Sequence, residues 1–313
     1  MTDLTRHRED RIAALQYDYA SREKHFIECC NLCGSRLWTI LTHRDRYGFP
    51  AQTVCCECCG LVMLNPRMTA EGYREFYSSV YRPLVSAYYG RIIDAQTIQR
   101  EQQAYAEEME HFLAPFLPKR RERTFLDIGG STGVVAAHFS RRFHLHGTII
   151  DPAPDEIAEA KALGIETIEG FIENWNPQGR LFDVIGMFQT IDHLLDVMAT
   201  LSKARSLLAS DGLLIADIVD FRAAYLKSGN IEQATKIDHP YYLVEETAEA
   251  FFARAGFKPV RRAYSDDHHL VAWICRPCEP RNDALPPDGF ATSLRREVRF
   301  VQNAPLGLRR DGK

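Results

Sequence analysis

The chain has 313 residues, of which 45% are hydrophobic, and a formal net charge of −4 at pH 7. This size and composition suit one large folded domain and a smaller one, and the acidic balance excludes a global basic field for nucleic acid. No apolar run approaches the ~20 residues of a membrane-spanning helix, and the charged N-terminus does not resemble a signal peptide. These features predict a cytoplasmic protein without membrane association.

The first 66 residues divide into a charged segment and a cysteine-rich one. Residues 1–25 carry five basic and five acidic side chains and are expected to form a solvated helix. Residues 26–66 hold seven of the nine cysteines, with two Cys-x2-Cys-Gly turns separated by 22 residues. Each turn presents two thiolates to one metal, and the glycine lets backbone N–H groups face the sulfurs.

This paired spacing predicts a closed, structural zinc site, because four thiolates leave no open position for water. The expected ligands are Cys30, Cys33, Cys56 and Cys59. Cys29, Cys55 and Cys58 offer shifted registers, but only in the chosen register is each pair followed by glycine. Reduced structural or redox thiols are the alternative.

Residues 67–118 are expected to form a helical connector that is rich in aromatic side chains. These are Tyr73, Phe76, Tyr77, Tyr81, Tyr88 and Tyr89. Such rings more often pack between domains, but they also suit a lid over a bound substrate. For a lid, Tyr81 and Tyr88 are the favoured candidates.

The stretch FLDIGGSTGVVAAHF, residues 125–139, indicates a strand, a glycine-rich turn and a helix. The turn glycines are Gly129, Gly130 and Gly133. The apolar run ends in Asp127, and the small residues after it let the backbone curl tightly beneath a ligand. A second strand, residues 147–150, ends in Asp151, whose carboxylate can accept both hydroxyls of a ribose. This pattern is typical of a nucleotide-binding crevice at the carboxyl ends of parallel strands.

Strands and helices alternate through the rest of residues 119–278. Further strands are expected at residues 165–170, 182–188, 212–220, 259–264 and 270–275, and helices at 195–208 and 244–255. The alternation implies an α/β fold with a mainly parallel sheet, and the last two strands imply an antiparallel edge. Residues 279–313 show several prolines and little apolar periodicity. We expect them to form a tail that is a flexible arm or wraps the partner subunit of a homodimer.

The glycine-rich stretch at residues 125–139 and the segment FDVIGMFQTIDH, residues 182–193, resemble motifs of class I S-adenosylmethionine (SAM) methyltransferases. The resemblance covers residues 119–278. It implies a Rossmann-like domain with seven strands and SAM as the cofactor.

The same resemblance implies a set of SAM contacts. The turn glycines are expected under the methionine and ribose, with Asp127 on the amino group and Asp151 on the ribose hydroxyls. The remaining expected contacts are Phe171 and Ile172 at the adenine, and Phe188 and Gln189 on the opposite wall.

A narrower resemblance begins where the cysteine turns run into GLVMLNPRMTAEGYREFY, residues 60–77. With the methyltransferase motifs, this segment resembles bacterial zinc-containing sugar methyltransferases, which include C-methyltransferases of nucleotide-linked keto-sugars. Those enzymes carry a Tyr-x-Glu-His-x-x-Tyr segment whose histidine is a base. The matching stretch is KIDHPYYL, residues 236–243, where lysine replaces the first tyrosine and aspartate replaces glutamate. The long C-terminal domain of the C-methyltransferases has no counterpart in this sequence.

Three histidine positions are candidates for a general base. A neutral histidine can take a proton near operating pH, and a neighbouring carboxylate fixes its tautomer. His239 is the first choice, with Asp238 as its carboxylate and with Tyr241 and Tyr242 lining the acceptor pocket. His193 is the second choice, and the histidine pair at residues 268–269 is the third. A purely structural role is the alternative for each.

The predicted function is SAM-dependent methylation of a sugar, either nucleotide-linked or part of a surface polysaccharide or secondary metabolite. An RNA base methyltransferase is the second hypothesis, because some bacterial rRNA methyltransferases join a cysteine zinc knuckle to this fold. Against it stand the acidic net charge and the few basic side chains between the cysteine pairs, Arg36, Arg44 and Arg46. The third hypothesis is a non-catalytic SAM-binding protein that docks a partner through its zinc module.

Overall fold

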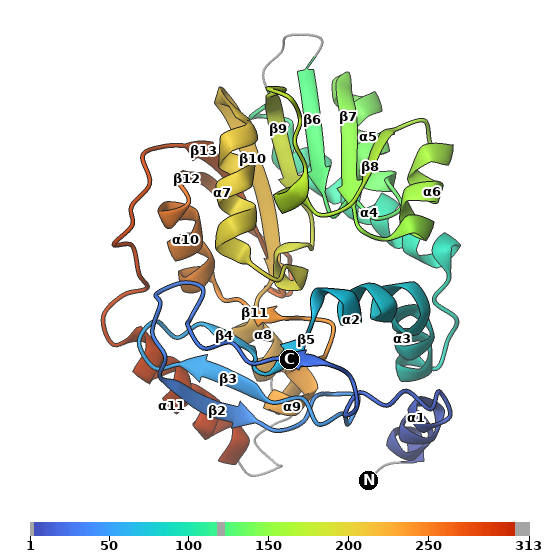
Figure 1. Ribbon diagram of the computed structural model, residues 1–313, viewed down its shortest axis with the longest axis vertical. Coiled ribbons are helices and arrows are strands. Elements are labelled where there is room, and N and C mark those ends of the chain that lie inside the picture. Colours follow the sequence, from blue (N-terminus) through green and yellow to red (C-terminus); the bar gives the residue numbers. More distant parts are fainter. Residues whose placement is uncertain (1–2, 118–122, 304–313) are drawn as a thin grey trace.

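A computed structural model describes residues 3–117 and 123–303, with a seven-stranded sheet at its centre (Figure 1). Its strands are β6 (Arg123–Ile128), β7 (Leu145–Asp151), β8 (Glu166–Glu169), β9 (Phe182–Met187), β10 (Leu208–Val219), β12 (Phe257–Tyr264) and β13 (Leu270–Pro277). They lie in the order β12-β13-β10-β9-β6-β7-β8. The strands from β6 to β10 are parallel, β13 is antiparallel to β10, and β12 is antiparallel to β13. The predicted α/β fold, with its largely parallel sheet and antiparallel edge, is confirmed.

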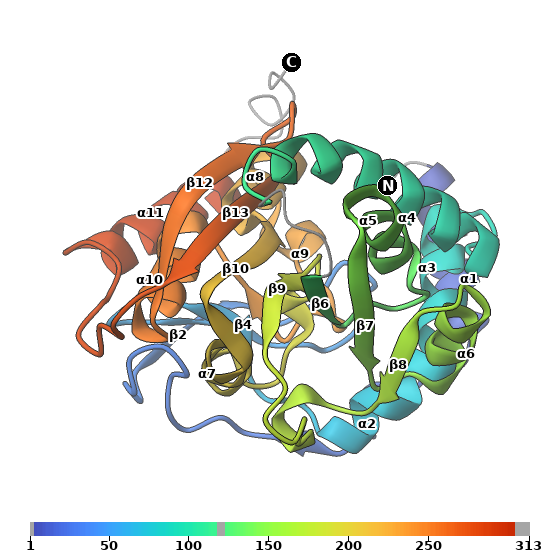
Figure 2. The ribbon, with the colours of Figure 1, turned by 90° about the horizontal axis from the view of Figure 1, so that it is seen from above.

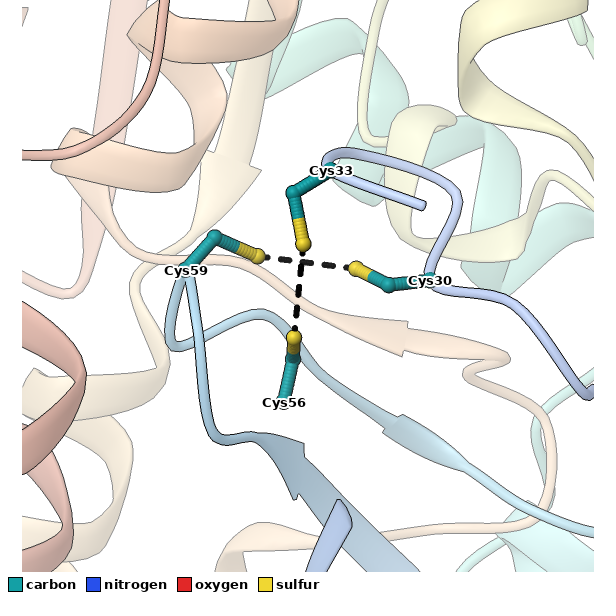
Figure 3. A group of neighbouring side chains, drawn as sticks. All are labelled: Cys30, Cys33, Cys56 and Cys59. Carbon is teal, nitrogen blue, oxygen red and sulfur yellow. Dashed lines mark hydrogen bonds between the residues drawn. The ribbon is translucent and has the colours of Figure 1, made fainter. Parts of the chain in front are cut away.

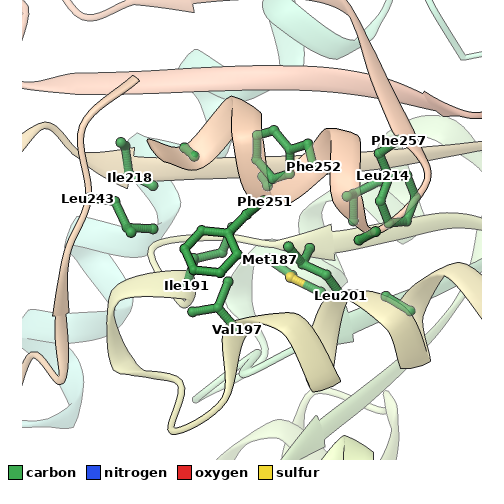
Figure 4. Close-up of a cluster of buried hydrophobic side chains, with 14 of the residues drawn as sticks. Met187, Ile191, Val197, Leu201, Leu214, Ile218, Leu243, Phe251, Phe252 and Phe257 are labelled. Carbon is green, nitrogen blue, oxygen red and sulfur yellow. The ribbon is translucent and has the colours of Figure 1, made fainter. Parts of the chain in front are cut away.

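Helices cover both faces of this sheet, so its central strands are buried on both sides (Figure 2). The covering helices are α4 (Ala95–Leu113), α5 (Val134–Phe143), α6 (Pro154–Ala162), α7 (Val197–Leu207) and α10 (Glu245–Arg254). Alternate strand residues face opposite sides. Met187 and Leu214 pack against Phe251 of α10 and Leu201 of α7, as Figure 4 shows, whereas Val184 joins the core beneath α4 and α5.

The N-terminal module contributes a second, smaller sheet that includes a strand from the far end of the sequence. Its strands are β2 (Trp38–Thr42), β3 (Thr53–Cys56), β4 (Val62–Leu64) and β11 (Tyr241–Tyr242). In β11, Tyr241 pairs with Met63 and Tyr242 with Val62, so a segment that follows β10 completes the sheet of the module. The module and the large sheet are therefore joined by backbone pairing. A separate two-stranded ribbon joins β1 (Lys24–His25) to β5 (Arg67–Met68).

The connector is helical and lies across the carboxyl edge of the large sheet. It comprises α2 (Ala70–Glu75), a π-helical turn η1 (Phe76–Val80) and α3 (Tyr81–Tyr89), followed by α4. In Figure 1 the arrowheads of the parallel strands point towards α2 and β11. Two short 3-10 turns, η2 (Ile172–Asn174) and η3 (Ile191–His193), follow β8 and β9 at this edge.

The helix predicted for residues 1–25 is shorter than expected and is docked rather than free. Helix α1 (Asp3–Ala13) lies beside α3, and the Arg11 Nε donates a hydrogen bond of 2.7 Å to the Ala87 carbonyl. Tyr19, beyond the end of the helix, is buried in the core of the module.

The expectation of little periodicity after residue 279 is wrong. Residues 290–303 form the amphipathic helix α11 (Phe290–Asn303), which packs on β3 and on α8 (Phe221–Ser228) and α9 (Ile231–Ala234). The buried face consists of Phe290, Ala291, Leu294, Val298 and Val301. This part of the tail covers its own module, while residues 304–313 lie outside the described part of the chain. Among the described helices, none combines the length and apolarity needed to span a bilayer.

Candidate active site and cysteine cluster

The glycine-rich turn after β6 brings neighbouring loops into close contact. Gly129 lies at φ +73°, a left-handed conformation that residues with a side chain rarely adopt. A Cβ atom at Gly129 would lie 2.6 Å from Thr190 Cγ2 in the loop after β9. Gly133 lies at φ +80°, and a Cβ there would lie 2.8 Å from the Cβ of Ala160 in α6. Packing between these segments therefore requires glycine at both positions.

Asp127, the next-to-last residue of β6, carries a buried carboxyl group with no donor. It is 1% exposed, and no described residue forms a hydrogen bond with either carboxylate oxygen. Burial, together with the charges of Asp151 and Asp217, holds the pKa of Asp127 well above its ordinary value. The turn approaches closely here, since a Cβ at Gly130 would lie 3.0 Å from Asp127 Oδ2. A carboxylate in this setting favours a cationic hydrogen-bond donor, such as an ammonium group.

Asp151 ends β7 and lies at the same edge of the sheet. Its Oδ2 accepts a hydrogen bond from the Ser131 N–H at 3.0 Å, and its Oδ1 accepts one from the Ala153 N–H at 2.9 Å. Burial raises the pKa of Asp151 to about 6, although these two bonds oppose the rise. Each oxygen keeps a further lone pair, so the carboxylate can still accept hydroxyl donors.

The four other predicted cofactor contacts differ in their surroundings. Phe171 is half-buried, and Ile172 in η2 belongs to the core on the α7 side. Phe188 packs against aromatic rings of the core beneath α4 and α5. Gln189 is exposed, and its backbone N–H donates a 2.5 Å hydrogen bond to a carboxylate of β10.

A polar cluster forms where the connector, the loop after β9 and the loop before β11 meet. It comprises Tyr77, His193, Lys236, Asp238 and His239. The ring centroids of His193 and His239 are 4.4 Å apart. Lys236 Nζ lies 3.0 Å from Asp238 Oδ2, and His239 Nε2 lies 3.9 Å from the same oxygen. The first two histidine candidates thus lie side by side.

The hydrogen bonds of Tyr77 determine which nitrogen of His193 can accept a proton. The Tyr77 hydroxyl lies 2.8 Å from the Asp238 carbonyl oxygen and 2.6 Å from His193 Nδ1. Because the carbonyl can only accept, it takes the single hydroxyl hydrogen. Nδ1 then donates its own proton to the hydroxyl oxygen, which leaves the His193 Nε2 lone pair free.

Burial and the charges in the cluster keep both imidazoles neutral. Burial and the charge of Lys236 lower the pKa of His193 to about 4 and that of His239 well below its ordinary value. Burial alone would raise the pKa of Asp238, but the charges of Lys236 and Arg46 outweigh it and lower that pKa. Near neutral pH the cluster therefore holds an ionised Asp238–Lys236 pair beside two proton acceptors.

Three side chains of the cluster have the spacing of a metal-binding group. Ligand atoms of His193, Asp238 and His239 lie within 4.8 Å of one another. The Lys236 ammonium already supplies a positive charge to Asp238. The arrangement therefore suits proton transfer better than cation binding.

Tyr241 and the histidines at residues 268–269 do not join this cluster. The Tyr241 ring is fully buried, and its hydroxyl donates a 3.2 Å hydrogen bond to the Leu195 carbonyl. Tyr242 takes the place beside the cluster, with its ring centroid 6.3 Å from that of His239. The pair at residues 268–269 lies in the turn before β13.

Sequence reasoning did not select Tyr77 or Lys236 as site residues. The available signal for Tyr77 was its place at the end of the segment 60–77. Lys236 stands where the resembling Tyr-x-Glu-His-x-x-Tyr segment has its first tyrosine, and its ammonium forms an ion pair with Asp238.

Four cysteine sulfurs converge between the two knuckle turns, as Figure 3 shows. Cys30 Sγ lies 3.5 Å from Cys59 Sγ, and Cys33 Sγ lies 3.5 Å from Cys56 Sγ. These separations exceed the ~2.05 Å of a disulfide bond and approach the roughly 3.8 Å edge of a tetrahedron with 2.3 Å zinc–sulfur bonds.

The cysteines of the shifted registers point elsewhere. Cys29 and Cys58 are exposed, and Cys55 is buried in the separate apolar core of the module. The four sulfurs that converge therefore belong to the two cysteine pairs that are each followed by glycine.

Comparison with known proteins connects this architecture to one enzyme class. The family described as "Methyltransferase domain" matches residues 99–262, more than half of the chain. No curated protein sequence matches significantly. The magnesium protoporphyrin IX methyltransferase of Synechocystis PCC 6803, solved with bound SAH, is 14% identical, with a TM-score of 0.50 over 64% of this chain and 96% of that chain. The CcbJ methyltransferase of Streptomyces caelestis is also 14% identical, with a TM-score of 0.46 over 56% of this chain and 90% of that chain.

The second structure is too distant to carry an argument, and the first supports the fold alone. The family match covers the glycine-rich turn, Asp151 and the residues of the polar cluster other than Tyr77. The chain belongs to the methyltransferase domain family and is a SAM-dependent methyltransferase.

Proposed function

We propose that this enzyme methylates a sugar, either nucleotide-linked or part of a surface polysaccharide or secondary metabolite, and that His239 removes a proton from the acceptor. The observation that supports this proposal is the pair of neutral imidazoles beside an ionised carboxylate at the carboxyl edge of the sheet. A sugar hydroxyl, or a carbon next to a sugar carbonyl, must lose a proton when it takes a methyl group.

Cofactor binding falls to the neighbouring part of the same edge, at the ends of β6 and β7. Asp127 would accept hydrogen bonds from the SAM ammonium, and Asp151 from the ribose hydroxyls. When bound, SAM supplies an electrophilic methyl group on a positively charged sulfur. Interacting charges run along the edge from Asp151 through Asp127, Asp217 and Asp192 to Lys236.

His239 is the base in this proposal because its Nε2 lies 3.9 Å from the Asp238 carboxylate, although Asp238 also raises the pKa of His193. Asp238 Oδ2, 3.9 Å from His239 Nε2, stabilises the imidazolium that proton removal creates. His193 is held through Nδ1 by Tyr77 and lies against the His239 ring. In this proposal His193 fixes the position of His239 and faces the acceptor.

The proposal includes a structural zinc ion held by Cys30, Cys33, Cys56 and Cys59. The fit rests on the sulfur separations of 3.5 Å and on the turns behind them. The Gly34 N–H donates to the Cys30 carbonyl at 2.8 Å, and the Gly60 N–H donates to the Cys56 carbonyl at 3.0 Å. Four thiolates close the coordination sphere, so this metal would hold the module together and take no part in methyl transfer.

Methyl transfer from methyl-labelled SAM to a panel of acceptors tests the acceptor class. The panel contains free hexoses, UDP-glucose, a bacterial polysaccharide and total rRNA. We expect label on a sugar or sugar nucleotide with the wild type and none with Asp127→Asn. Label on rRNA alone would overturn the sugar assignment and leave the SAM site standing.

A further inference from the structure

Two arginines near the polar cluster form no ion pair among the side chains that the structure describes. Arg8 of α1 and Arg46 of the β2–β3 loop both lie over the ring of Tyr88 in α3. Their guanidinium carbons are 4.3 and 4.7 Å from its centroid. No carboxylate of a described residue forms an ion pair with either guanidinium, and the Nε atom of each is buried without a hydrogen-bond partner.

Arg46 connects this site to the catalytic cluster. It donates a hydrogen bond from Nη2 to the Tyr47 hydroxyl at 3.2 Å, and that hydroxyl donates to Asp238 Oδ1 at 3.4 Å. The charge of Arg46 contributes to the lowered pKa of His239. Two hydrogen bonds through Tyr47 therefore connect Arg46 to Asp238, the residue before the proposed base, and Arg8 lies over the same tyrosine ring as Arg46.

Nearby acidic groups neutralise these arginines only in part, through the interaction of Asp238 with Arg46. Asp45 accepts hydrogen bonds from three backbone N–H groups, those of Tyr47, Phe49 and Ile237. Asp238 pairs with Lys236, and Glu156 in the first turn of α6 pairs with Arg82 of α3. Positive charge is therefore left over at this corner of the site.

A third arginine in the N-terminal part of the chain differs from Arg8 and Arg46 in its ion pairing. Arg22 also lies over a tyrosine ring, at 5.1 Å from the Tyr17 centroid, but it pairs with Glu75 at 3.0 Å. Stacking on tyrosine alone thus does not explain why Arg8 and Arg46 lack carboxylates.

We infer that Arg8, Arg46 and Tyr88 form a binding site for a phosphate or pyrophosphate group of the acceptor. A guanidinium group can donate two parallel hydrogen bonds to two oxygens of one phosphate. The Tyr88 ring, over which both guanidinium groups lie, holds them in position. This inference rests on the proposed function, and it specifies the acceptor as a phosphorylated sugar or a sugar nucleotide.

Calorimetric titration of the full-length, SAH-saturated protein tests the site with inorganic pyrophosphate, UDP-glucose, glucose 1-phosphate and free glucose. We expect the phosphate-bearing probes to bind, and glucose to bind weakly or not at all. Arg8→Gln and Arg46→Gln should each weaken binding about tenfold to a hundredfold, the loss typical of one hydrogen-bonded charge. Arg22→Gln, the matched control, should bind like the wild type.

The pattern of binding separates this inference from the proposed function. Equal binding of all probes by wild type and both variants would overturn the phosphate site, even if SAH binds and sugars are methylated. Loss of SAH binding in the wild type would instead contradict the proposed function. Stronger binding of UDP-glucose than of glucose 1-phosphate identifies a sugar nucleotide, and the reverse order identifies a sugar phosphate. Arg8 lies on an outer helix, so Arg8→Gln keeps the test valid if Arg46→Gln fails to fold.

Discussion

Replacing Asp127 with asparagine should stabilise the ligand-free enzyme and weaken its binding of SAM. The wild-type carboxyl group is 1% exposed, has no donor among the described residues, and lies near two further carboxylates. Asparagine keeps the shape of the side chain and removes the charge. The same carboxylate that destabilises the empty site is expected to bind the SAM ammonium.

The sign of the pH dependence follows from the raised pKa values. A carboxyl group whose pKa is raised in the folded state stabilises the fold below its unfolded pKa, and this stability is lost as pH rises through the folded pKa. For Asp151 and Asp217, a pKa raised from 3.8 to about 6 means that stability is lost between about pH 4 and pH 6. Each shift corresponds to about 3 kcal/mol. Asp127 acts in the same direction, so these carboxyl groups favour the fold near pH 5 over pH 8, whereas the lowered pKa values of His193 and His239 act in the opposite direction.

For Asp127→Asn at pH 8 we expect about 1–3 kcal/mol of added stability, because the substitution removes a buried charge that lies near two other carboxylates. This corresponds to a rise in Tm of roughly 1–5 °C. SAH affinity should fall about 10- to 150-fold, because a hydrogen bond to a charged group contributes about 1.5–3 kcal/mol.

Thermal unfolding at pH 5 and pH 8, together with calorimetric titration of SAH, measures both effects. Asp266→Asn, in the exposed turn before β13, is the matched control and should change neither quantity. Wild-type SAH affinity in Asp127→Asn would refute the reasoning, whatever happens to Tm. A lower Tm at pH 8 would show that the carboxylate has a stabilising partner in the empty site.

Three further predictions concern other parts of the molecule. Cys59→Ser should lose zinc in metal analysis, whereas Cys58→Ser, which changes an exposed thiol, should retain one zinc per chain. His239→Ala should bind SAH normally yet lose roughly 10²–10⁴-fold in turnover, and wild-type turnover from pH 6 to 9 would exclude it as the base. Leu294→Ala in the buried face of α11 should lower the free energy of unfolding by about 2–5 kcal/mol in urea titration. Phe300→Ala on the exposed face of the same helix should change it little, and equal losses would contradict the observed packing.

The elements of the large sheet could be predicted because their signals are local. Residues 182–188 and 212–220 are apolar runs, and β9 and β10 occupy them. Helix α11 could in principle be predicted from the sequence, because the apolar residues Phe290, Leu294 and Val298 recur every four residues. The charged residues between them and the prolines before them masked this period.

Pairing across the molecule could not be predicted in the same way. Strand β11 has two residues and exists because β4, far away in the sequence, offers it an edge. The contact between Tyr77 and His193 likewise depends on how the connector crosses the sheet. Sequence reasoning therefore proposed His193 and His239 as rivals, whereas the fold places them in one cluster.

The shared small sheet gives the cysteine module a direct route to the proposed base. Cys59 is followed within three residues by β4, and the Leu64 N–H donates a 3.0 Å hydrogen bond to the carbonyl of Pro240, next to His239. If zinc fixes the start of β4, its removal should displace His239 while leaving the glycine-rich turn and Asp127 in place. We therefore expect a zinc-depleted enzyme to bind SAH within about threefold of the wild-type affinity and to lose at least about tenfold in turnover.

Restoring zinc to the depleted enzyme is the control, because recovery of turnover separates loss of the metal from irreversible unfolding. Parallel loss of SAH affinity and turnover would mean that the module supports the whole domain and not the loop of His239 in particular. Full turnover without zinc would show that the pairing of β11 with β4 persists on its own. In that case the apolar contacts of Tyr241 and Leu243, both fully buried, would suffice to hold the base.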